Sequence, residues 1–124
     1  MASFMIKGIG IDIIEIARVR QAVQRYGDAF LRRIFTPEEL KYCRDKKSFK
    51  YPELAVRFAA KEAYAKAVGT GIAPAKGLGW KDIAVTSLPG GQPRLLIRNK
   101  KAGKTHVSLS HSRAYAVAAV YVER

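Results

Sequence analysis

The stretch RFAAKEAYAKAVGTG, residues 57–71, decides how the rest of the chain is interpreted. Alanine and other helix formers fill it up to the first glycine, so it predicts a helix with an apolar stripe. At 3.6 residues per turn, Glu62 lies on the same stripe as Phe58 and Lys66. A carboxylate on a half-buried apolar stripe is costly unless it is paired or binds a metal ion.

This helix alone leaves two interpretations open. Glu62 and Lys66 can form an ordinary helix pair, worth roughly 0.2–0.5 kcal/mol, and this is the simpler interpretation of the segment. Arg57 and Lys61, however, form a second row of like charges one turn apart, which is unfavourable without an anion between them. Both rows together would suit a metal ion and phosphate. The choice between a metal site and an ordinary helix pair depends on the rest of the chain.

The composition is that of a folded and strongly basic protein. Its 124 residues fit one domain over 1–124 and are 48% hydrophobic, with no low-complexity tract. The formal net charge of +13 implies an anionic partner, such as nucleic acid, a membrane surface, a phosphorylated substrate or an acidic protein.

Two further features bear on the compartment. Cys43 is the only cysteine, which excludes an internal disulfide and a cysteine-based zinc site and fits a reducing cytoplasm. Lys7, Asp12 and Glu15 interrupt the apolar N-terminal run, so we expect neither a signal peptide nor a membrane span. A cytoplasmic protein is therefore predicted.

The first predicted strand covers Phe4–Ile14, where isoleucines alternate with Gly8, Gly10 and Asp12. The two glycines remove side chains from the face of Asp12, so another element or a ligand can come close to this carboxylate. A nucleotide-binding glycine motif is not present, because Ile13 occupies its third glycine position. Asp12 can alternatively serve only to end the strand and favour the next helix.

The remaining pattern predicts an α+β fold, with helices clustered against an antiparallel sheet. Helices are expected over 16–26, from Thr36-Pro37 with a capping box completed by Glu39, and from Pro52 to Gly69. Residues 28–31 are expected to form only a short turn. Strands are expected over Trp80–Leu88, Arg94–Arg98, Thr105–Ser110 and Ala114–Val122. The glycine-rich loop at 70–79 should lie close to whatever the central helix binds.

His111 lies between two serines at the last predicted turn, but adjacency in sequence is no evidence of a catalytic triad. Arg113 follows it, so phosphate contact is the better functional interpretation, and a purely structural turn histidine is the alternative.

Three separated segments now carry recognisable motifs: Gly10-Ile11-Asp12 with Ile16 and Arg18; residues 58–63, FAAKEA, with 66–71, KAVGTG; and 107–111, VSLSH, with Tyr115-Ala116. FTPEEL at 35–40 lies between the first two. In length and motif order the chain resembles the bacterial holo-acyl-carrier-protein synthase family, the short type within the 4'-phosphopantetheinyl transferase superfamily. The resemblance spans nearly the whole chain and implies that fold.

The resemblance implies transfer of 4'-phosphopantetheine from coenzyme A to a serine of apo acyl carrier protein, releasing adenosine 3',5'-bisphosphate, in fatty acid biosynthesis. It also implies a homotrimer with active sites between subunits. Asp12 and Glu62 would bind Mg2+, which prefers hard oxygen ligands, and Lys66 would reach the same phosphates. The expected catalytic residues are thus Asp12, Glu62 and Lys66. Whether Glu62, Asp12 or a water on the metal accepts the serine proton stays open.

The same resemblance assigns binding roles. Arg57, Lys61, Lys66 and His111 are expected to bind coenzyme A phosphates, Arg57 and His111 from neighbouring subunits. Arg18, which matches the family motif, is expected to dock the acidic carrier protein from the first helix. Arg25 is expected to join it on the basis of its charge alone, since it matches no motif.

Two other classes remain in view. A small basic nucleic-acid-binding protein would explain the charge equally well, but the sequence shows no base-stacking platform, and such a protein has no use for Asp12 and Glu62 near phosphate. A non-catalytic subunit that only docks carrier proteins is the third interpretation.

Overall fold

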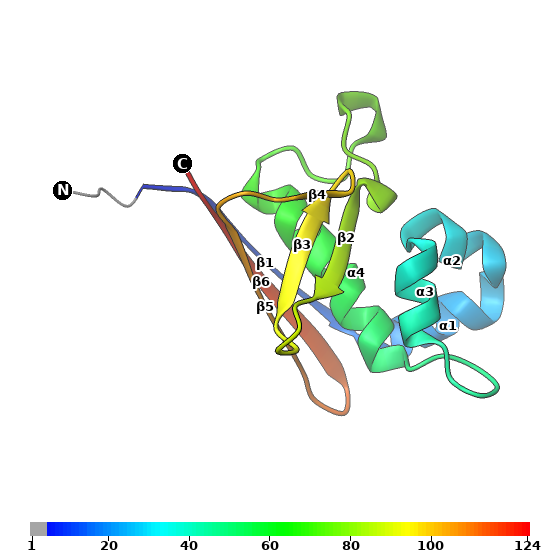
Figure 1. Cartoon of the computed structure of the whole chain (residues 1–124). Helices are drawn as coiled ribbons and strands as arrows, with labels where there is room; N and C mark the ends of the chain where they lie inside the picture. The colour runs from blue at the N-terminus through cyan, green and yellow to red at the C-terminus, as the bar shows by residue number, and fades with distance from the viewer. Residues whose placement is uncertain (1–4) are drawn as a thin grey trace.

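A computed structural model describes residues 5–124. Within this range the chain forms four α-helices and two three-stranded antiparallel sheets, which confirms the α+β class (Figure 1). The helices are α1 (Ile16–Tyr26), α2 (Asp28–Ile34), α3 (Pro37–Cys43) and α4 (Tyr51–Ala67). The long sheet has the order β1 (Ile6–Glu15), β6 (Tyr115–Glu123), β5 (Thr105–His111), and the short sheet the order β2 (Ile83–Ser87), β3 (Pro93–Ile97), β4 (Lys100–Lys101).

Glycines in β1 let the long sheet lie directly on α4. A Cβ atom built on Gly8 would lie 1.7 Å from the carbonyl oxygen of Ala67, and one on Gly10 would lie 1.8 Å from that of Ala63. Real side chains cannot approach so closely, so the predicted close approach is confirmed and its partner is the central helix. Asp12 follows on the same face of β1. The expected first residue of this strand, Phe4, lies outside the described residues.

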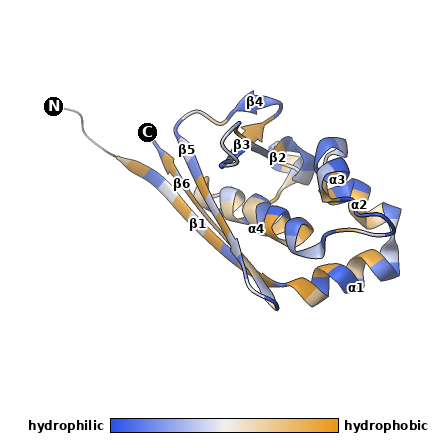
Figure 2. Ribbon diagram, turned by 60° about the horizontal axis from the view of Figure 1, so that its bottom comes forward, coloured by the Kyte–Doolittle hydropathy of each residue, from blue (hydrophilic) through white to orange (hydrophobic). Residues whose placement is uncertain are grey.

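The opposite face of the long sheet is apolar and open. Ile9, Ile11 and Ile13 are 67%, 61% and 64% exposed, and they lie across from Tyr121, Ala119 and Val117 of β6. The ribbon of β1 in Figure 2 changes colour along its length, as expected where isoleucines alternate with other residues. Nothing in residues 5–124 covers the face.

Helix α4 forms the centre of the core. Its alanines are buried against β6 and against the short sheet, where Ile83 and Val85 meet them. Small side chains on several sides of one helix allow a sheet on one side and a second sheet on another to come close. The helix spans 51–67, so it begins one residue before the predicted Pro52 and ends two residues before the predicted Gly69, within the usual uncertainty of helix ends.

Helices α1, α2 and α3 gather at one end of the molecule, around Leu31, Phe35 and Leu54 (Figure 1). The predicted capping box is confirmed: the backbone N–H of Glu39 donates to Thr36 Oγ1 at 3.2 Å, and that of Thr36 donates to Glu39 Oε1 at 2.9 Å. The short turn expected at 28–31 is instead the two-turn helix α2.

The second half of the chain departs from the predicted strands in two places, one of which is the short strand β4 (Lys100–Lys101), where no strand was expected. Trp80–Asp82, expected to begin a strand, forms a 3-10 turn, η2, because Asp82 Oδ2 accepts the backbone N–H of Gly79 at 2.8 Å. Pro74–Lys76, within the expected loop, forms a second such turn, η1. None of the helices within residues 5–124 has the length and apolarity needed to cross a membrane.

Candidate active site

Strand β1 and helix α4 bring Asp12, Glu62 and Lys66 together. Lys66 Nζ lies 3.0 Å from Asp12 Oδ1 and also donates to the carbonyl oxygen of Ile11 at 3.0 Å. The three side chains line one cavity of about 450 Å³ with Arg18 and Phe58, and we call it the acid cavity. Residues 50 positions apart in sequence meet here because the glycines of β1 let the strand lie on α4.

The two carboxylates of the acid cavity disfavour each other's charge. Partial burial raises the pKa of Glu62, the negative charge of Asp12 raises it further, and only Lys66 opposes the shift. A divalent cation would relieve this repulsion, and carboxylate oxygens are the ligands that Mg2+ prefers. Among residues 5–124 no third Asp, Glu, His or Cys joins the pair, so a metal ion here would complete its shell with water or substrate oxygens. The donor set fits Mg2+ on these grounds.

Glu62 also lines a second cavity, of about 560 Å³, on the other side of its helix turn. Arg33, Ile72, Trp80 and Lys81 are among the residues around it, and we call it the tryptophan cavity. Its wall is fixed by Phe58, whose ring stacks on Trp80 with centroids 4.9 Å apart. Sequence reasoning missed Arg33, Trp80 and Lys81 as site residues. It did predict that the glycine-rich loop would lie near the central helix, and Ile72 comes from that loop.

Arg57 and His111 line a third cavity, of about 200 Å³, which we call the arginine cavity. Arg57 is buried, its guanidinium lies 4.4 Å from the Tyr42 ring centroid, and its Nη1 lies 3.4 Å from Glu53 Oε2. Its buried Nε has no hydrogen-bond partner among the described residues. A buried guanidinium with a free donor suits an anionic group. The residues that line this cavity do not include Asp12, Glu62 or Lys66, so one chain holds the expected residues in separate places.

Lys61, expected to bind phosphate, does not face any of these cavities. Its side chain is 0% exposed and lies 2.7 Å from Glu39 Oε1. The same ammonium donates to the carbonyl oxygens of Trp80, at 3.2 Å, and Ile83. With its donors used and its path to solvent closed, Lys61 cannot reach a phosphate in this structure, and we do not retain that role for it.

The expected docking residues lie on α1. Arg18 and Arg25 are both exposed, but only Arg18 lines the acid cavity. Arg25 lies at the far end of the helix, with its guanidinium 5.4 Å from the Tyr26 ring centroid.

Comparison with known sequences places these residues in a family. The family model described as the 4'-phosphopantetheinyl transferase superfamily matches residues 8–120, a span that includes Asp12, Glu62 and Lys66 of the acid cavity and Arg57 and His111 of the arginine cavity. The chain belongs to this superfamily. It is 45% identical over 127 aligned residues to a holo-[acyl-carrier-protein] synthase of Koribacter versatilis, covering 96% of this chain and 99% of that one.

Solved structures of this superfamily agree with the fold. A holo-(acyl-carrier-protein) synthase from Bacillus anthracis, in complex with CoA (3',5'-ADP), is 37% identical with a TM-score of 0.77 and covers 98% of both chains. The Neisseria meningitidis holo-[acyl-carrier-protein] synthase is 34% identical with a TM-score of 0.83, covering 97% of this chain and 100% of that one. The phosphopantetheinyl transferase fold expected from the motifs is therefore confirmed.

Proposed function

We propose that this superfamily member transfers 4'-phosphopantetheine from coenzyme A to a serine of apo acyl carrier protein in a Mg2+-dependent reaction. The observation that carries the proposal is the acid cavity, where two mutually repelling carboxylates and a lysine converge beside an exposed arginine. The synthase names of the relatives and the coenzyme A bound in the Bacillus anthracis structure support the same substrates.

In the proposed reaction the serine oxygen bonds to the phosphorus that carries pantetheine, the hydroxyl proton is lost, and adenosine 3',5'-bisphosphate departs. Asp12 and Glu62 would hold Mg2+, which when bound neutralises negative charge on the pyrophosphate. Lys66 has a half-exposed side chain and already points its ammonium at Asp12, so it can contact phosphate oxygens at the same place. Glu62 and Asp12 also line the cavity where the proton is released, and both remain candidates for its acceptor.

We also propose that copies of the chain assemble, as a homotrimer, through the open face of the long sheet. Exposed isoleucines in a row on β1, with Tyr115 and Tyr121 on the same face, form an apolar surface of the kind that oligomers bury. The separation of the arginine cavity from the acid cavity supports shared sites: Arg57 and His111 of one copy would hold coenzyme A phosphates near Asp12, Glu62 and Lys66 of another.

The proposed protein partner is the acidic carrier protein, which Arg18 would meet at the mouth of the acid cavity, with Arg25 further along α1. Fatty acid biosynthesis in the cytoplasm is the proposed context. The charge of +13 alone would suit nucleic acid as well, but the acid cavity and the family membership both favour the transferase.

Intact-mass spectrometry of an apo acyl carrier protein tests the proposal. The carrier protein is incubated with this protein, coenzyme A and Mg2+, and a matched sample contains EDTA. We expect a mass gain of one phosphopantetheine group that EDTA abolishes. A folded sample that modifies none of several carrier proteins would contradict the proposal and favour docking without catalysis.

A further inference from the structure

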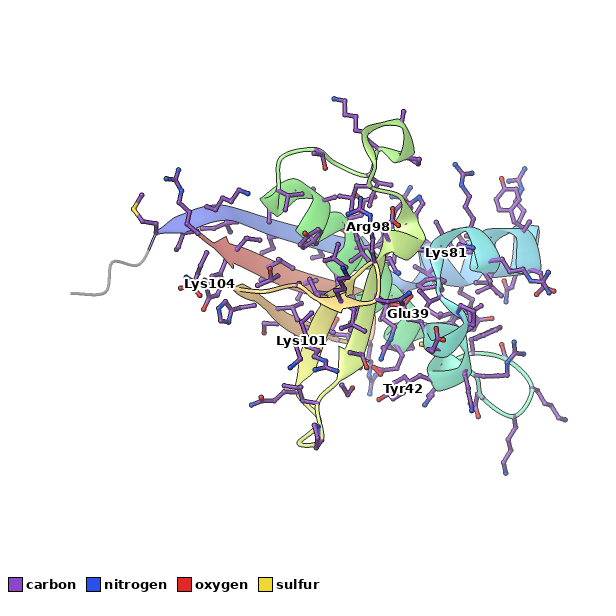
Figure 3. The ribbon with its side chains drawn as sticks, turned by 45° about the horizontal axis from the view of Figure 1, so that its top comes forward. Glu39, Tyr42, Lys81, Arg98, Lys101 and Lys104 are labelled. Atoms are coloured by element: carbon purple, nitrogen blue, oxygen red, sulfur yellow. The ribbon has the colours of Figure 1, made fainter. Side chains whose placement is uncertain are left out.

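The buried Glu39–Lys61 pair joins four elements, α3, α4, η2 and β2. Glu39 is 2% exposed and Lys61 0% exposed, and Nζ lies 2.7 Å from Glu39 Oε1. Glu39 lies where α3 meets β2, and its Oε2 accepts the backbone N–H of Val85 at 2.9 Å (Figure 3). Lys61 adds hydrogen bonds to the carbonyl oxygens of Trp80 and Ile83. The pair thus links α4 to α3, to η2 and to β2.

This pair is connected to Glu62, a proposed metal ligand, in two ways. Glu62 is the next residue of α4 after Lys61, and it lines both the acid cavity and the tryptophan cavity. Trp80, whose carbonyl oxygen Lys61 holds, forms the opposite wall of the tryptophan cavity. The hydrogen bonds of one ammonium therefore fix the helix turn that carries Glu62 and the wall that faces it.

Stability alone is a poor reason for such a pair. Removing two charges from water is costly, and apolar residues of similar volume in place of a buried ion pair are often neutral or stabilising. Hydrogen bonds with defined directions, in contrast, fix the rotation of a helix more tightly than alanine packing does. Of the polar contacts of the pair, the one from Lys61 to the carbonyl oxygen of Trp80 reaches a residue that lines a cavity together with Glu62. The other contacts of Glu39 go to the backbone N–H groups of Thr36 and Val85.

We propose that Glu39 and Lys61 are positioning residues for the reaction: their buried pair sets the orientation of the Glu62 carboxylate against Asp12 and the position of the Trp80 wall. The inference rests on the proposed function for its kinetic consequence, but not for its structural one. Neither residue lines the acid, tryptophan or arginine cavity, and both side chains are buried, so we do not assign them a contact with substrate.

The test uses two variants and a matched control. Glu39→Gln removes the negative charge but keeps the shape and one acceptor oxygen, and Lys61 keeps its two carbonyl acceptors. The double variant Glu39→Gln/Lys61→Met removes both charges, so that no unpaired charge is left buried. Glu38→Gln removes the same charge one residue away, on the exposed side of α3.

Three quantities are measured: kcat and KM for carrier protein, the dissociation constant of Mn2+ by electron paramagnetic resonance, and the near-ultraviolet circular dichroism of Trp80. Trp80 is the only tryptophan in the chain, so its spectrum reports directly on the wall. Loss of a partner that orients a metal ligand typically costs about 10- to 100-fold in affinity or activity. We expect both variants to lose about 10-fold in kcat and in Mn2+ affinity, as for other losses of such partners. Their KM for the carrier protein should change little, and their Trp80 spectrum should differ from that of wild type. The control variant Glu38→Gln should behave like wild type in all three measurements.

The pair is merely structural if Glu39→Gln changes only the melting temperature. In that case its kcat, its Mn2+ affinity and its Trp80 spectrum would equal those of wild type. The double variant repeats the test, and Glu39→Gln decides alone should the double variant be unstable. If the wild-type protein transfers no phosphopantetheine, the proposed function fails, whereas Mn2+ affinity and the Trp80 spectrum still decide the positioning role.

Discussion

Asp12 and Glu62 place two negative charges in one half-buried cavity, and this has a consequence for single substitutions. Glu62→Gln and Asp12→Asn should each reduce turnover by more than the roughly 10- to 100-fold typical of losing only an outer partner of a metal ligand. Glu62→Gln should leave the metal-free protein at least as stable as wild type, because burial and the negative charge of Asp12, which raise the pKa of Glu62, oppose a charge at this position. Asp12→Asn removes repulsion too, but it also loses the ion pair with Lys66. Steady-state rates and melting temperatures in EDTA check both. Near wild-type turnover in either variant would overturn the metal assignment.

Cys43 gives a prediction about pH. Burial raises the pKa of its thiol from 9.0 to about 11, so in the folded protein the thiol stays protonated at neutral pH. In the unfolded chain it ionises near its ordinary pKa. Its contribution to stability is therefore complete below pH 9 and is lost as the pH rises toward 11. Urea unfolding of wild type and Cys43→Ala across this range should show a steeper fall for wild type, and parallel curves would contradict the shift.

At the scale of elements, the contact of β1 with α4 both stabilises the fold and forms the site. Gly10→Ala places a methyl group where the carbonyl oxygen of Ala63 lies, so the strand must move away from the helix. We expect a loss of about 1–3 kcal/mol in the free energy of unfolding, as for other overpacked positions, together with lower activity as Asp12 shifts. Gly90→Ala is the control, because no atom lies within 4 Å of its Cβ position. Equal effects in the two variants in urea titrations would argue against the contact.

Sequence patterns predicted this contact only in part. The glycines of β1 indicated a close approach, but only the fold shows that α4 is the partner. Lys61 shows the limit more clearly. Helical spacing places Lys61 in a row with Arg57. The spacing carries no information on which elements cover that row, and in the fold α3 and β2 bury Lys61. The sequence did not indicate Trp80 as a site residue. Its ring stacks on Phe58 from the 3-10 turn η2, and this turn depends on a hydrogen bond from the backbone N–H of Gly79 to Asp82.

At the scale of the whole molecule, the open apolar face of the long sheet is the surface through which we propose that copies assemble. Ile11 lies in the middle of the exposed row of β1, opposite Ala119. Ile11→Asp should convert the proposed homotrimer into single chains, because a buried, unpaired charge at an interface is costly. Light scattering coupled to size-exclusion chromatography measures the change. Wild type that elutes as a single chain, or a variant that stays assembled, would contradict the use of this face.

Shared sites can be tested by mixing inactive subunits. Arg57→Ala and Glu62→Gln disable different cavities, so mixed assemblies would contain sites in which both halves are intact. Random mixing of equal amounts should restore roughly a quarter of wild-type activity if each site lies between two neighbours in a closed ring. A mixture of Asp12→Asn with Glu62→Gln, which disable the same cavity, is the control. Recovery in neither mixture would place the whole site within one chain.

This separation of the cavities is what a single sequence conceals. The family resemblance led us to expect Arg57 and His111 to act from neighbouring subunits, and the chain itself places these two residues on one cavity and Asp12 on another. Spacing along the chain determines local elements, whereas distances between cavities depend on how those elements pack.

The apolar face of the long sheet also has a consequence for how the stability of the protein depends on its concentration. If copies assemble through this face as proposed, burial of the exposed isoleucines stabilises the folded chain, and by mass action the stabilisation grows with protein concentration. The melting temperature should then rise with protein concentration and fall on dilution. In a cell that makes few copies, supply of new chains would set how many remain folded and assembled, so the level of expression would act on activity more than proportionally.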